Sequence, residues 1–87
     1  MMNVMTFEEK VWEIDQIRVV IRAPWDKEVG DFDWKNKAAD NSSITNWLDN
    51  RILPKIGGLS AIIIEGTGLK PHGRKTLDKV RNSYKVD

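Results

Sequence analysis

A glycine-rich stretch that follows the most apolar run of the chain has the residue types of a phosphate-binding loop. Residues 65–76 read EGTGLKPHGRKT. In the motif GxxxxGK[ST], backbone amides surround a phosphate while the lysine and the hydroxyl residue reach its outer oxygens and a metal ion. Gly68 and Gly73 have the required spacing, but Arg74 precedes the Lys-Thr pair. Because one extra residue rotates the lysine by about 100° around a helix, the sequence does not predict a nucleotide-hydrolysing loop.

Two other interpretations of this stretch remain open. The predicted order is strand, turn and helix, so the first helical amides, in residues 74–77, have no partner within the helix. The helix dipole favours a negative charge at such amides, which predicts a simple anion contact. Alternatively, the glycines mark a structural turn between a strand and a helix, which is their most frequent role.

The second half of the chain is basic, although the net charge is only +1. Residues 1–50 carry ten acidic and six basic groups, whereas residues 51–87 carry eight basic and three acidic groups. This division predicts a dipolar molecule whose 70–85 segment binds an anion or a nucleic-acid backbone. The alternative is that these charges only solvate the last helix. The candidate residues for binding are Lys70, His72, Arg74, Lys75, Lys79 and Arg81.

The longest irregular segment combines acidic groups with large aromatic side chains. Residues 24–41 read PWDKEVGDFDWKNKAADN. A connection of this length in a compact domain carries function or packs on the core. Because tryptophan is enriched among the residues that dominate protein interfaces, we interpret this segment as a protein-binding surface, with a lid over the core as the alternative. The candidate residues are Trp25, Asp31, Phe32, Asp33 and Trp34.

Two further tryptophans occupy positions that are typical of core residues. Trp12 lies in a run rich in valine and isoleucine, and Trp47 lies at helical spacing from Ile44. Both positions continue an apolar period, so we expect both side chains to be buried.

The elements that must position these residues have the predicted order β-β-α-β-α. Residues 10–15 and 17–23 are rich in β-branched side chains and predict a hairpin, or one long bent strand. Serine caps and apolar residues at helical spacing predict a helix at 43–53. The apolar run 59–65 predicts a strand that is covered on both faces. A last amphipathic helix is expected at 74–84.

These elements predict one small α/β (α+β) domain that spans residues 1–87. A chain of 87 residues has room for one modest core. The step from strand 17–23 through the helix to strand 59–65 suggests a right-handed crossover between parallel strands. The expected architecture is therefore two helices packed on a three-stranded mixed sheet, with 59–65 as its central strand.

The composition excludes several classes of site. The chain has no cysteine and one histidine, so disulfide frameworks, thiolate metal sites and the common zinc and triad arrangements are excluded. Asp31 and Asp33 have a spacing that can bind a cation but lack a further ligand. We therefore expect no enzymatic activity, no cofactor and no metal. No apolar run approaches the ~20 residues of a membrane helix, so the expected location is cytoplasmic, without membrane association.

The functional expectation is a non-enzymatic protein that binds a protein partner. In size and style the chain is similar to phage- or mobile-element-encoded inhibitors such as anti-CRISPRs, and to immunity proteins and antitoxins. This similarity implies an inhibitor or adaptor. The alternative expectation is direct nucleic-acid binding by the basic 70–85 segment, and an exposed sheet edge also allows a homodimer.

Overall fold

The first long element of the chain is a helix. The computed structural model describes residues 1–85. Helix α1 spans Val4–Asp15 and begins after Asn3, whose side-chain oxygen accepts a hydrogen bond from the backbone N–H of Thr6 at 2.8 Å. It ends at Gln16, which adopts a left-handed conformation with φ of 57°. Asparagine before the first turn and a left-handed residue after the last are common helix boundaries.

The predicted strand at 10–15 is therefore wrong. Residues that are three and four positions apart form one buried face of α1, and this pattern begins at Val4, six residues before the predicted strand. Trp12 follows this buried face by one position, about 100° around the helix, and is 42% exposed. The prediction that Trp12 belongs to the core is also wrong. The buried residues of the helix are Val4, Phe7, Val11 and Asp15.

Two of the predicted elements form a short antiparallel ladder. Strand β2, Arg18–Ile21, pairs with strand β4, Ala61–Ile64, so that Val19 lies opposite Ile63. Along β2 the side chains alternate between exposed and buried, as the sequence predicted. The strands expected at 17–23 and 59–65 are thus confirmed, with shorter bounds.

The three-stranded mixed sheet is not formed. Strand β4 pairs with β2 alone among the described residues, so it is not a central strand, and the pairing is antiparallel rather than parallel. A second small sheet joins β1, Met2–Asn3, to β3, Glu28–Val29. Because residues 10–15 are helical, the sheet lacks its expected third strand, and an antiparallel pair needs no crossover of fixed hand. The predicted class, a small α+β domain, is confirmed.

The predicted helix at 43–53 is present as one continuous helical segment. Helix α2, Ile44–Trp47, is capped by Ser43, whose hydroxyl oxygen accepts a hydrogen bond from the N–H of Asn46 at 3.2 Å. It continues as a turn of π-helix, Leu48–Ile52, and a turn of 3-10 helix, Leu53–Lys55. Helical geometry thus extends through the proline at the position where the sequence predicted an end. The tighter last turn accommodates a residue without an N–H donor.

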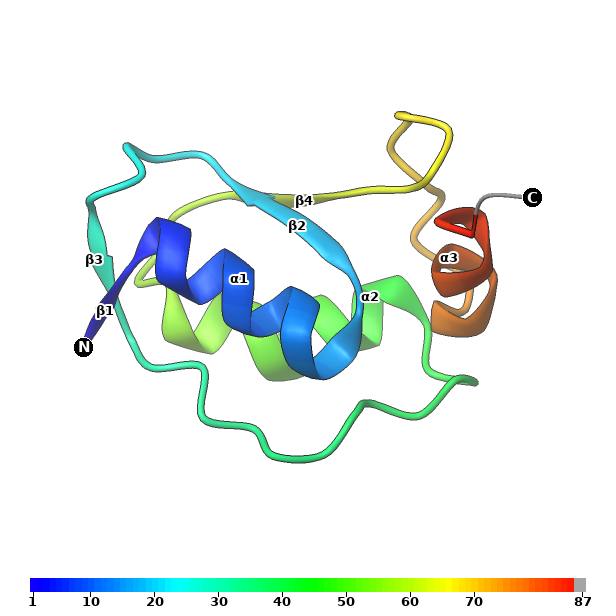
Figure 1. The fold of residues 1–87 in the computed structure, drawn as a ribbon, viewed down its shortest axis with the longest axis horizontal. Coiled ribbons are helices and arrows are strands. Elements are labelled where there is room, and N and C mark those ends of the chain that lie inside the picture. The colour runs from blue at the N-terminus through cyan, green and yellow to red at the C-terminus, as the bar shows by residue number, and fades with distance from the viewer. Residues whose placement is uncertain (86–87) are drawn as a thin grey trace.

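The last helix is shorter than predicted. Helix α3 spans Leu77–Ser83 instead of 74–84. In Figure 1, α1 lies across the helical segment 44–55, β2 and β4 run along one side, and α3 lies at one end. Within residues 1–85, no helix combines the length and the apolar character that crossing a membrane requires.

A buried aspartate joins four parts of the fold. Asp15, at the end of α1, accepts hydrogen bonds from the indole N–H of Trp47 and the backbone N–H of Ala38, both at 2.8 Å. The guanidinium of Arg51 lies 3.0 Å from the same carboxylate. The backbone carbonyl of Asp15 accepts a hydrogen bond from Nε of Arg81 on α3. A buried charge with this many partners fixes the relative positions of the elements that supply them.

Candidate functional site

The amides expected to bind an anion at 74–77 are largely occupied by the protein itself. The backbone N–H of Arg74 donates to the imidazole Nδ1 of His72 at 3.1 Å, and the N–H of Lys75 donates to the carbonyl of His72 at 2.9 Å. The N–H of Leu77 donates to the carbonyl of Ser42 at 2.9 Å. These donors already have partners, so they do not form an open anion site.

The first backbone N–H groups of α2 and of α3 each find their acceptors in the segment that precedes the other helix. The N–H groups of Ile44 and Thr45 donate to carbonyl oxygens of residues 75 and 73, while the N–H groups of Leu77 and Asp78 donate to carbonyl oxygens of residues 42 and 40. Unpaired amides at a helix start need an acceptor, and here each segment supplies the acceptors of the other. The glycine-rich stretch therefore has a structural role as a turn that caps α2.

The six basic candidates do not form one surface. Lys75 makes an ion pair with Glu65, which lowers the pKa of Glu65 through the hydrogen bond from the ammonium group. Arg81 is buried and pairs with Asp40 at 2.6 Å. The exposed members are Lys70, His72 and Arg74 on the loop and Lys79 on α3.

The predicted aromatic surface is also divided. Phe32 is buried in the core and packs edge-to-face on Phe7, with ring centroids 5.4 Å apart. The ring of Trp34 lies 4.4 Å from the guanidinium of Arg51, which in turn donates to the carbonyl of Asn36. This part of the segment packs back on the protein, as expected for a lid.

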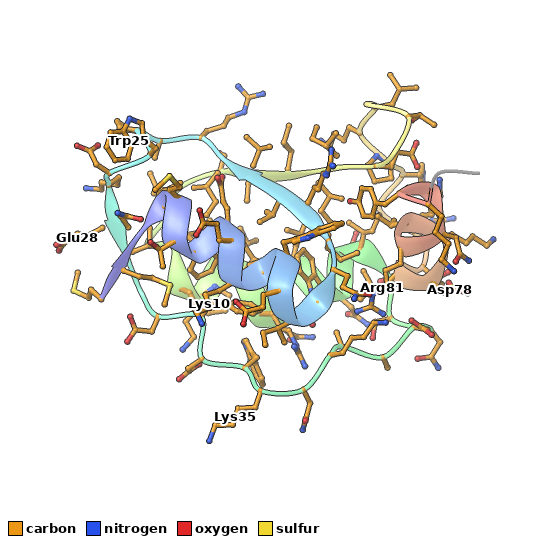
Figure 2. All side chains as sticks on the ribbon, viewed as in Figure 1. Lys10, Trp25, Glu28, Lys35, Asp78 and Arg81 are labelled. Atoms are coloured by element: carbon orange, nitrogen blue, oxygen red, sulfur yellow. The ribbon has the colours of Figure 1, made fainter. Side chains whose placement is uncertain are left out.

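The remaining members of that candidate set lie apart from one another. Asp31 pairs with the N-terminal amine at 3.2 Å, and Asp33 pairs with Lys55 at 3.4 Å. Trp25 is 65% exposed, and Figure 2 shows it near the N-terminal end of α1. Its carbonyl accepts a hydrogen bond from the N–H of Met5 at 3.0 Å.

The sequence did not predict a group of exposed apolar side chains that gathers between α1 and β2. Met5 and Trp12 on α1 and Val20 on β2 are 43%, 42% and 44% exposed. They line one hollow of about 400 Å³ between the helix and the strand, which Arg18 also lines. We call this surface the α1–β2 face and define it by Met5, Trp12, Arg18 and Val20. The available signal was the seven-residue spacing of Met5 and Trp12, which places them on one side of a helix.

The aromatic end of the α1–β2 face is held in a fixed arrangement. The ring centroids of Trp12 and Tyr84 lie 5.3 Å apart in an edge-to-face contact. The guanidinium of Arg18 lies 5.6 Å from each centroid. Such contacts between a cation and aromatic rings are favourable, so Trp12 is oriented by its neighbours although much of its surface is exposed.

Charged groups border the α1–β2 face on both sides. Glu8 and Glu9 line the hollow on the helix side, and Arg18 lines it on the strand side. Glu8 also accepts a hydrogen bond from the N–H of Ile21 at 2.9 Å, which closes α1 against β2. The apolar centre is thus bordered by acidic groups on one side and a cation on the other.

Tyr84 closes the end of the β2–β4 ladder. Its hydroxyl accepts a hydrogen bond from the N–H of Arg18 at 3.0 Å and donates one to the carbonyl of Ile64. These two residues are the last pair of the ladder, so the hydroxyl bridges the two strands at this end. Burial raises the pKa of the Tyr84 hydroxyl, and the positive charge of Arg18 offsets only part of this effect.

The folded protein is expected to titrate its tyrosine at a higher pH than the denatured chain does. Tyr84 is the only tyrosine, so phenolate absorbance reports this group alone. A raised folded-state pKa means that the folded form holds the phenolic proton more tightly. The stabilisation is complete below the unfolded pKa of about 10 and is lost as pH rises through the folded-state pKa. Equal midpoints of the tyrosine titration in buffer and in concentrated urea would contradict the partial burial of this hydroxyl.

Comparison with known proteins found no family model, no curated protein and no solved structure that matches this chain.

Proposed function

We propose that the chain is a non-catalytic binding protein that docks on a protein partner through the α1–β2 face. The observation that carries the proposal is the gathering of three large apolar side chains, each more than two-fifths exposed, around one hollow. An exposed apolar patch with a charged border is typical of an interaction site. The centre supplies the tryptophan on which interface energies often depend.

The borders of the face specify the chemistry of the partner. Glu8 and Glu9 favour a basic group on one side of the hollow, and Arg18 favours an acidic group on the other. The proposed partner therefore presents an apolar side chain between a basic and an acidic residue. Trp25, which is linked to Met5 through the backbone hydrogen bond, extends the apolar area at the start of α1. An inhibitor or an adaptor would act by occupying such a surface on its partner.

Two observations support binding rather than catalysis or direct contact with nucleic acid. His72, the only histidine, uses its Nδ1 to accept a hydrogen bond within its own loop. Of the six basic candidates, Lys75 and Arg81 are engaged with Glu65 and Asp40. The remaining cations give nucleic-acid binding less support than the apolar face gives protein binding.

The test compares two tryptophans of similar exposure on different parts of the surface. Trp12 is 42% exposed and Trp34 is 40% exposed, so Trp34→Ala is a matched control for Trp12→Ala. Tagged wild type and both variants are used to capture protein from nuclease-treated host lysate, and the affinity for the recovered partner is then measured. We expect Trp12→Ala to weaken binding by about 2 kcal/mol or more, roughly thirtyfold, while Trp34→Ala binds as wild type does.

The control is thermal denaturation of both variants, which checks that each remains folded. A partner that binds Trp12→Ala as tightly as wild type, or that is lost equally from both variants, contradicts the proposed face. Capture of nucleic acid in the untreated lysate, with no protein partner after nuclease, would contradict protein binding and favour the basic loop instead.

A further inference from the structure

A polar cleft lies between α3 and the end of α1, and it shares no lining residue with the α1–β2 face. Its volume is about 380 Å³. Four residues with donor groups on their side chains line it: Gln16, Lys37, Asn82 and Lys85. These four side chains are exposed and come from three parts of the chain. Arg81 lines the same cleft.

Arg81 is the unusual member of this cleft. It is 8% exposed, and its Nη2 is buried without a hydrogen-bond partner, the one such side-chain atom found in residues 1–85. Its Nε donates to the carbonyl of Asp15, and its Nη1 pairs with Asp40. Figure 2 shows Arg81 directed from α3 toward the end of α1. A buried guanidinium is permanently charged. Asp40 bonds to only one of its two terminal nitrogens, so positive potential remains at the other.

The charges of the cleft favour an anion. Two acidic groups, Asp40 and Asp78, also line it. Asp40 is paired with Arg81, and Asp78 accepts hydrogen bonds from the hydroxyl of Thr76 and the N–H of Lys79. Both carboxylates are therefore already bonded to donors of the protein. The ammonium groups of Lys37 and Lys85 form no ion pair among the described residues.

We propose that this cleft binds a phosphate group. The ammonium groups of Lys37 and Lys85 and the amides of Gln16 and Asn82 donate to its oxygens, and Arg81 supplies positive potential at the wall. Lysine ammonium groups bind phosphate as point charges, and amide donors complete its hydrogen bonds. The phosphate comes from a small ligand or from a nucleic-acid backbone, since both present the same oxygens. This site is independent of the protein partner proposed above.

The experiment titrates the full chain with inorganic phosphate at constant ionic strength and follows backbone amides by NMR. We expect saturable shifts at the residues lining the cleft. The double variant Lys37→Gln/Lys85→Gln is expected to bind phosphate at least about tenfold more weakly. Lys79→Gln is the control, because Lys79 is an exposed lysine on α3, beside the cleft, and does not line it. The substituted lysines are all exposed. Thermal denaturation of each variant checks that it is folded.

A second arm uses a short single-stranded DNA oligonucleotide in place of inorganic phosphate. Oligonucleotide binding that is lost in the double variant supports the site and identifies a nucleic-acid phosphate as its ligand. Saturable phosphate binding without oligonucleotide binding supports the site and identifies a small ligand. The proposal is overturned if neither probe saturates, if the double variant binds as wild type does, or if Lys79→Gln loses as much affinity as the double variant.

Discussion

Replacing Asp15 with alanine is expected to lower the free energy of unfolding by about 3–5 kcal/mol. The reason is that removing one member of a buried ion pair leaves the charge of the other member without compensation. The indole N–H of Trp47 and the backbone N–H of Ala38 would lose their acceptor, and Arg51 would lose its carboxylate. Urea denaturation followed by far-ultraviolet circular dichroism measures the change, since this signal reports mainly the backbone rather than the environment of Trp47.

The matched control is Glu13→Ala on the same helix. Glu13 is exposed and makes one ion pair with Lys10 at 3.7 Å. Exposed pairs of this kind contribute little, so the control is expected to change stability by less than about 0.5 kcal/mol. Asp15→Asn keeps an acceptor for Ala38 but loses the charge that faces Arg51, and its effect is expected to lie between those of the other two variants. A loss below about 1 kcal/mol for Asp15→Ala would contradict the assigned role.

Substituting Gly66 with alanine is expected to be the second most destabilising change. A Cβ at this position would lie 1.6 Å from the carbonyl oxygen of Ser83. The obstacle is backbone, and the N–H of Gly66 also donates to the hydroxyl of Ser83 at 2.8 Å. The substitution must push the end of α3 away from the end of β4. We expect a loss of about 3 kcal/mol, the upper end for overpacking in a close contact.

Gly73→Ala separates this effect from the general cost of replacing a loop glycine. A Cβ at Gly73 would meet the hydroxyl of Thr45 at 2.5 Å, and a side chain can rotate away where backbone cannot. The loss for Gly73→Ala is therefore expected to be about 1 kcal/mol or less. Equal losses for the two variants in the same denaturation experiment would show that the contact between Gly66 and Ser83 is not tightly packed.

Local sequence signals predicted the elements whose structure depends on neighbouring residues. The alternation along β2, the serine cap before α2 and the apolar run of β4 are all patterns within a few residues. The strand predicted at 10–15 failed because its valine, isoleucine and tryptophan content suits a strand, while the helix is established by Asn3 and the apolar spacing that begins at Val4. The wrong assignment of Trp12 followed directly, since one position along a helix changes the direction of the side chain by about 100°.

The candidate sites depended on contacts that no local pattern contains. Phe32 and Trp34 have similar neighbours in the sequence, yet Phe32 packs on Phe7 and Trp34 on Arg51. Whether a basic residue is available for binding was decided in the same way. Arg81 is engaged by Asp15 and Asp40, which lie 66 and 41 residues away.

The sequence by itself determined the chemical groups that the chain possesses and its broad class: one histidine, no cysteine, four tryptophans, and a mixture of helices and short strands. The tertiary structure decided which of those groups face solvent. It brought Met5, Trp12 and Val20 around one hollow. It also placed the backbone carbonyls of Asp40 and Ser42 where they accept hydrogen bonds from the first N–H groups of α3. The physical reason is that helix and strand patterns arise from neighbouring residues, whereas exposure and charge pairing arise from the packing of segments that are distant in the chain.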